Sequence, residues 1–286
     1  MTRRPEETFL SDAALISVAR LRLLAAAACQ RHDSLAARAI DERGDSIGPV
    51  LLRMLTEDIA GADESRGMFA VWLLAEIVIH DLMSHPDRRL LISWFAVPPY
   101  PTATELPHEQ AWYIESTSLV TSVKSNDAVR LLTLALKSAC EPIATRAALA
   151  WRAIGAASRS DHNPRGATSR HQFATYQAGV VDGLLQAAET GVPSLRRCAV
   201  QALCDCVGQP ADWPRLVAIA LAALRDDAEN LAGDAIRLLD EIAVLDPEAK
   251  FAVKSRQHLL TDIQRKMAAG SDREQLQSLL AQLDAN

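Results

Sequence analysis

An alanine-centred apolar stretch that recurs along the chain limits the folds open to this sequence. It reads IATRAALAWRAIG at residues 143–155 and returns in recognisable form at 66–79, 195–208 and 231–244. In each copy an alanine is followed by apolar residues three to four and seven positions later, which is the spacing of one face of an α-helix. The recurrence of one helical unit predicts a helical-repeat architecture, and about twelve expected helices are too many for a single four-helix bundle.

The spacing of the copies agrees with repeated helix pairs. When aligned on Ala70, Ala147, Ala199 and Ala235, the copies are separated by 77, 52 and 36 residues. The shortest separation matches a repeat of about 35 to 47 residues. The middle one fits such a repeat with a polar insertion, and the longest predicts two repeats, with residues 89–124 as the intervening pair. Because one pair cannot cover both of its apolar faces, neighbouring pairs must stack.

Composition favours the same fold class and a cytoplasmic protein. Hydrophobic residues make up 49% of the chain but aromatic residues only 5%, so the core must be aliphatic and rich in alanine. The longest apolar runs are far shorter than the roughly 20 residues of a membrane span. The N-terminus lacks an apolar signal region. The five cysteines have no zinc-type spacing and are typical of reduced, buried thiols.

The chain resembles the HEAT family of α-solenoids and the related armadillo-like arrays. The resemblance rests on the stretches TRAALAWRAIG and LRRCAVQAL and on an arginine near the start of the second helix of a pair, at Arg66, Arg146 and Arg196. The last copy departs from the pattern, with Gly233 and Asp234 where arginine is expected. The resemblance implies an all-α solenoid of stacked antiparallel helix pairs, and it brings no functional residues with it.

We expect one domain over residues 1–286. Its predicted parts are N-terminal capping helices at 1–45, HEAT-like repeats at 46–245 with insertions at 98–109 and 158–172, and C-terminal capping helices at 246–286. Proline disfavours helix at the first insertion, and the second is the most polar part of the chain. Asp246 and Pro247 predict the start of a helix that reaches about Ala269.

Two groups of residues are candidates for binding a partner protein. Loops on a rigid scaffold often carry recognition, and Trp and Tyr often anchor interfaces. The candidates are Trp94, Tyr100, Trp112 and Tyr113 around the proline-rich insertion, and His162, Arg165, Arg170 and His171 in the polar one. The alternatives are that the aromatic residues fill the gap left by an irregular repeat and that the polar insertion is a surface segment without a role.

One group has residue types that suit a metal. Glu76 and His80 lie four residues apart on one helix face, with Asp81 beside them and His85 near the expected helix end. Imidazole and carboxylate together suit zinc or iron. Some HEAT-like hydroxylases bind iron through repeated His-Glu pairs, but this sequence has no second cluster that matches the one at Glu76 and His80. The alternative is that these side chains are solvated or cap the helix.

The remaining patterns bear on the class of function. A net charge of −6 disfavours an extended electrostatic hold on nucleic acid. The sequence has no phosphate-binding glycine loop, nucleophile elbow or His-Glu-x-x-His motif, so it gives catalysis no positive support. We expect a protein–protein interaction scaffold, adaptor or regulatory subunit that is not an enzyme, needs no cofactor and has another protein as its partner. A metal-dependent enzyme or metal-binding protein that uses Glu76 and His80 is the alternative, and a nucleic-acid-binding repeat protein is the weaker one.

Overall fold

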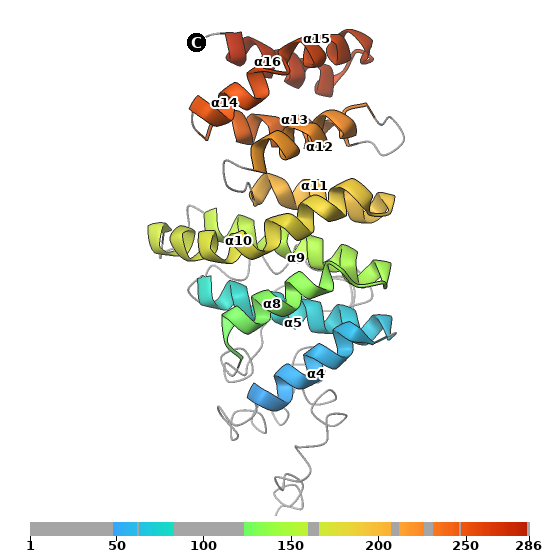
Figure 1. The fold of residues 1–286 in the computed structure, drawn as a ribbon, viewed down its shortest axis with the longest axis vertical. Helices are drawn as coiled ribbons and strands as arrows, with labels where there is room; N and C mark the ends of the chain where they lie inside the picture. Colours follow the sequence, from blue (N-terminus) through green and yellow to red (C-terminus); the bar gives the residue numbers. More distant parts are fainter. Residues whose placement is uncertain are drawn as a thin grey trace, which may run out of the picture.

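The regular structure of the described residues is entirely α-helical (Figure 1). The computed structural model describes residues 48–61, 63–82, 123–159, 166–206, 212–225, 231–245 and 247–284. Its helices are α4 (Gly48–Ala60), α5 (Glu64–Leu82), α8 (Ser125–Ala135), α9 (Glu141–Arg159), α10 (Gly166–Thr190), α11 (Pro193–Asp205), α12 (Trp213–Ala223), α13 (Ala232–Ala243), α14 (Pro247–Lys254), α15 (Gln257–Lys266) and α16 (Ser271–Asp284). None of these described helices is long and apolar enough to cross a lipid bilayer.

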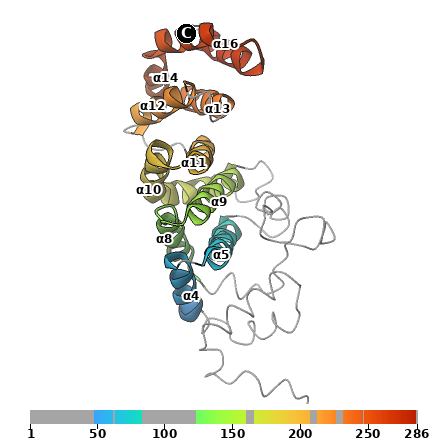
Figure 2. The same cartoon turned by 90° about the vertical axis from the view of Figure 1, so that its right-hand side faces the viewer.

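The helices form two layers that run the length of the stack. Figure 2 shows α4, α8, α10 and α12 in one layer and α5, α9, α11 and α13 in the other. Each helix packs against the next one in its own layer and against its partner in the other, so that α4/α5, α8/α9, α10/α11 and α12/α13 are the stacked pairs. This arrangement confirms the predicted all-α solenoid of antiparallel helix pairs.

The recurring alanine stripe forms the core between the pairs. Ala70, Ala147, Ala199 and Ala235 are all buried, and so are the apolar residues that follow them at helical spacing. Trp151 is the largest side chain that is fully buried, and most of its neighbours in the core are aliphatic. Burial on this scale supplies the main favourable term in folding, at about 25 cal/mol per Å² of apolar surface.

Two glycines allow the helices of the second layer to come unusually close. A Cβ atom at Gly67 would lie 2.1 Å from the Cδ1 atom of Ile143, and one at Gly155 would lie 2.7 Å from the Cβ atom of Asp205. The first contact brings α5 directly against α9. The predicted repeat at residues 89–124 lies almost entirely outside the described residues.

Two sequence-based boundaries differ from the structure. The predicted insertion at 158–172 is shorter, because Ser158 and Arg159 end α9 and α10 begins at Gly166. The Ser158 hydroxyl donates a hydrogen bond to the carbonyl of Gly155, 2.7 Å away, so this polar residue continues the helix. The predicted segments 1–45 and 98–109 lie outside the described residues.

The predicted helix from Pro247 to about Ala269 is two helices, α14 and α15. The N–H of Arg256 donates to the carbonyl of Val253, one residue nearer than the α-helical acceptor, which tightens the chain and ends the first helix. No proline or glycine marks this break. Beside the backbone bond, the hydroxyl of Ser255 donates to the carbonyl of Ala252 over 2.8 Å at this break.

Replacing Gly155 by alanine tests the close approach of α9 and α11. Gly155→Ala places a methyl group against the backbone of Asp205, and we expect it to lower the free energy of unfolding by about 1–3 kcal/mol. The matched control is Gly179→Ala in α10, where nothing lies within 4 Å of the added carbon. This control should raise the free energy of unfolding by about 0.5–1 kcal/mol, because glycine is unfavourable inside a helix. Urea denaturation measures both, and equal effects of the two substitutions would contradict the close approach.

Candidate functional site

The outward stripes of α9, α11 and α13 form one continuous polar surface. Side chains that are not buried recur along these helices at helical spacing, and hydrogen bonds join them across the layer. We call this the ladder surface. It consists of Glu141, Thr145, Arg152 and Arg159 on α9, Ser194, Arg197, Gln201 and Asp205 on α11, and Asp234, Arg237 and Glu241 on α13. Asp205 alone among these is buried and lies at the floor of the surface.

One set of hydrogen bonds crosses the three helices through a single amide. The Nη1 of Arg152 donates to the Oε1 of Gln201 over 2.8 Å, and the Nε2 of Gln201 donates to the Oδ2 of Asp234 over 2.9 Å. Gln201 thus connects α9 to α13 through both the oxygen and the nitrogen of its side-chain amide. Closer to the start of α9, the hydroxyl of Ser194 donates to the carboxylate of Glu141.

A second set of contacts joins two positively and two negatively charged side chains. The Asp205 carboxylate accepts a hydrogen bond from Arg159, and its Oδ1 lies 3.4 Å from the Nη2 of Arg237. Glu241 lies near both guanidinium groups, with its oxygens 3.6 Å from Arg159 Nη1 and 3.9 Å from Arg237 Nε. Arg159 also donates to the carbonyl of Cys204 over 3.0 Å. The four side chains are therefore held in place by contacts from more than one helix.

Three cysteine thiols beneath this surface have raised pKa values because they are buried. Burial raises the pKa of Cys204 to about 12 and raises the pKa of Cys206 as well. Burial also raises the pKa of Cys198, against a smaller opposing effect of nearby guanidinium groups. Because the thiolate is the nucleophile and the metal ligand, these three residues act as small apolar side chains at neutral pH.

The residues of the predicted metal site have other surroundings. Glu76 is fully buried in α5, and Asp81 accepts hydrogen bonds from Gln172 and from the hydroxyl of Tyr176, which lies 2.6 Å away. Burial and the bond to Asp81 raise the pKa of Tyr176. Asp81 thus links α5 to α10. In the part of the chain that is described, no three His, Cys, Asp or Glu side chains gather as metal ligands. His85 and the side chain of His80 lie outside that part.

The side chains of the predicted partner-binding residues lie outside the described part of the structure. Arg170 and His171 belong to α10, but their side chains are not among those described. The other candidates lie outside the described residues, namely Trp94, Tyr100, Trp112, Tyr113, His162 and Arg165. These assignments stay predictions.

Sequence reasoning overlooked the ladder surface, although a signal was present. The copies aligned on Ala199 and Ala235 both carry polar residues two and six positions after the alanine. These positions hold Gln201 and Asp205 in α11, and Arg237 and Glu241 in α13. Matching polar offsets in successive repeats place such residues side by side once the repeats stack.

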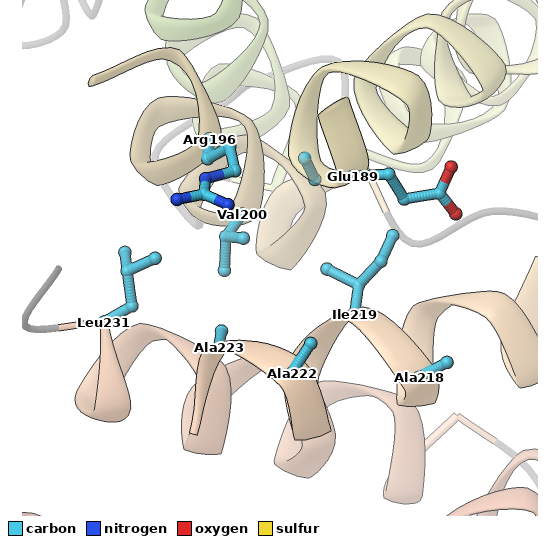
Figure 3. Close-up of a pocket in the computed structure, with 9 residues that line it drawn as sticks. Glu189, Arg196, Val200, Ala218, Ile219, Ala222, Ala223 and Leu231 are labelled. Atoms are coloured by element: carbon cyan, nitrogen blue, oxygen red, sulfur yellow. The ribbon is translucent and has the colours of Figure 1, made fainter. Parts of the chain in front are cut away.

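A small pocket lies between the α10/α11 pair and α12 (Figure 3). Its volume is about 260 Å³, just below the range of about 300–1,000 Å³ typical of pockets for drug-sized ligands. Its walls are mostly aliphatic and are formed by Ala188, Glu189, Arg196, Val200, Ala218, Ile219, Ala222, Ala223 and Leu231.

The acidic residue of this pocket, Glu189, forms an ion pair with Arg215. Figure 3 shows the carboxylate of Glu189 turned away from the cavity. Its two oxygens accept hydrogen bonds of 2.6 and 2.7 Å from Arg215 of α12, and this pairing lowers the pKa of Glu189. The pair ties α10 to α12 across the boundary between repeats. The pocket is therefore a mostly aliphatic gap in the stack, and the ion pair lies outside it.

Comparisons with known proteins agree on the fold. No protein-family model matches the chain, and no curated protein matches its sequence. A designed armadillo repeat protein is 14% identical, with 92% of this chain and 99% of that chain covered and a TM-score of 0.52. A second designed armadillo repeat protein, in complex with the peptide (KR)4, is 15% identical over the same shares, with a TM-score of 0.53. An engineered protein is 16% identical, covering 98% of this chain and 97% of its own, with a TM-score of 0.53.

These similarities define the class of the protein as an α-helical repeat solenoid. The likeness extends over nearly the whole length of both chains, and it concerns the arrangement of helices. The predicted resemblance to α-solenoids is thereby confirmed at the level of the fold.

Removing the charge of Asp205 tests how strongly the ladder surface holds its helices together. Asp205→Asn leaves two guanidinium groups without their buried partner, and we expect the free energy of unfolding to fall by about 1–3 kcal/mol. The loss stays below that of a fully buried pair because both arginines are partly solvated. The control is Asp262→Asn, whose pair with Arg265 is exposed and should contribute less than about 0.5 kcal/mol. Denaturation curves that shift equally for both variants would refute a structural role for Asp205.

Proposed function

We propose that this protein is a non-catalytic scaffold, an adaptor or regulatory subunit, that binds another protein on its ladder surface. The observation that carries the proposal is the set of hydrogen bonds and ion pairs across α9, α11 and α13. Side chains that are already held in one arrangement lose little conformational entropy on binding, so their contacts contribute more of their energy to affinity. Repeat proteins use such extended surfaces for recognition.

The fold comparison lends support at the level of architecture. One of the similar designed proteins is in complex with a peptide, which is a property of that protein. A stack of helix pairs offers a partner one long surface instead of an enclosed cavity. The ladder surface spans three successive repeats, and its side chains include both hydrogen-bond donors and acceptors. This combination suits an interface that is polar and specific.

Partner capture with surface variants tests the proposal. The variant Arg197→Glu with Arg237→Glu reverses two exposed charges on the ladder surface. The matched control, Arg53→Glu with Arg265→Glu, reverses two exposed arginines elsewhere, which also pair with acidic residues of their own helices. Circular dichroism and urea denaturation establish that each variant is folded.

We expect proteins captured by the wild type from its native cell to stay bound to the control and to be lost from the ladder variant. Titration of the purified partner should then show affinity at least about tenfold lower for the ladder variant, which is 1.4 kcal/mol. A partner retained by the ladder variant and lost from the control would place binding on another surface.

A further inference from the structure

Asp205 lies deeper than the two arginines that it pairs with. In the four-charge set, the side chain of Arg237 is 47% exposed, those of Arg159 and Glu241 are 35% and 32% exposed, and Asp205 is only 6% exposed. Arg197, about two turns before Asp205 on α11, is also exposed. The guanidinium group of Arg237 is therefore the outermost charge of the set. A partner approaching this part of the surface meets that positive group first, although the chain has a net charge of −6.

Two arginines lie at the neighbouring part of the surface. Burial is the largest influence on the pKa of Cys198, and the charges that also act on it include three guanidinium groups, those of Arg152, Arg197 and Arg146. Arg146 is buried, whereas Arg152 is partly exposed and Arg197 is exposed. The carboxylate that acts on Cys198 is that of Asp234, which already accepts a hydrogen bond from Gln201.

The outer guanidinium group has hydrogen-bonding capacity beyond its present contacts. Arg237 reaches Asp205 and Glu241 only over 3.4 and 3.9 Å. Charge-assisted hydrogen bonds from a guanidinium group to a carboxylate are typically about 2.7–2.9 Å long, and the group has five N–H donors. A carboxylate from outside can therefore make shorter bonds to Arg237 than the ones it has.

We propose that the partner docks on the ladder surface through an acidic segment, whose Asp and Glu side chains pair with Arg159, Arg197 and Arg237. This inference rests on the proposed function and specifies the chemistry of the partner. Bidentate pairing between guanidinium and carboxylate gives such a contact direction as well as attraction. Electrostatic complementarity of this kind mainly sets specificity and the rate of association.

An acidic protein segment fits this surface better than nucleic acid does. The carboxylates of Asp234 and Glu241 lie between the arginines, so the positive charge is interrupted. A nucleic acid strand carries a phosphate about every 3.4 Å and would set some of them against these carboxylates. A protein segment can place its acidic side chains opposite the arginines alone. The negative net charge of the chain further opposes a long polyanion.

Fluorescence anisotropy with short labelled probes tests the inference on the full chain. The probes are the acidic peptide (Glu-Asp)4, the basic peptide (Lys-Arg)4 and a single-stranded oligonucleotide of thymidines, each at about 50 mM and 150 mM salt. We expect the acidic peptide to bind most tightly, and more weakly at higher salt because exposed charges are screened.

Variants locate the binding and separate charge from shape. Arg197→Gln with Arg237→Gln should weaken binding of the acidic peptide at least about tenfold, whereas Arg53→Gln with Arg265→Gln should leave it unchanged. Arg197→Lys with Arg237→Lys should bind with intermediate affinity, since it keeps the charge and loses the bidentate geometry. Tighter binding of the basic peptide or the oligonucleotide, or equal binding of the acidic peptide by both Gln variants, would overturn the inference.

The outcome also separates this inference from the proposed function. If the native partner needs the ladder surface but the acidic peptide does not bind there, the scaffold function stands and the acidic partner is wrong. If neither the native partner nor the acidic peptide needs the ladder surface, both proposals fail.

Discussion

The close packing of alanine-bearing helices in the second layer is the interaction on which the rest of the structure depends. Alanine at the contact positions, together with Gly67 and Gly155, lets α5, α9, α11 and α13 lie directly against one another. At this short distance, polar side chains on the outward stripe of one helix reach those of the next. The ladder surface is thus a consequence of the packing beneath it, and substitutions in the core should disturb both.

The charges of the ladder surface would serve the proposed function more through their arrangement than through their strength. Exposed ion pairs contribute little to stability, and even a buried pair costs desolvation that offsets much of its attraction. Asp205 is buried where α11 passes Gly155, and it holds two arginines that extend toward solvent. A buried acid that orients two arginines leaves the guanidinium group of Arg237 as the outermost charge of the set. That arrangement is the physical basis of the proposed acidic partner.

The fold was predictable from the sequence because its signal is local and repeated. The alanine and the apolar residues that follow it at helical spacing define one helix face in each copy. All of these residues are buried, as expected. The spacing of the copies along the chain does not reveal which of them touch, as α5 and α9 do. The break between α14 and α15 at Arg256 was not predicted, because the surrounding residues are ordinary helix formers. The site was the least predictable part: Arg152, Gln201 and Asp234 meet only through the register between three helices, which no single stretch encodes.

The central claim is that the partner contacts the layer formed by α9, α11 and α13. Site-specific photocross-linking tests it most directly, with benzoylphenylalanine placed at position 197 on the ladder surface or at position 218 on the exposed side of α12. The account predicts a cross-link to the native partner from position 197 and none from position 218. A cross-link from position 218 alone would show that the other layer binds the partner, and would contradict the account.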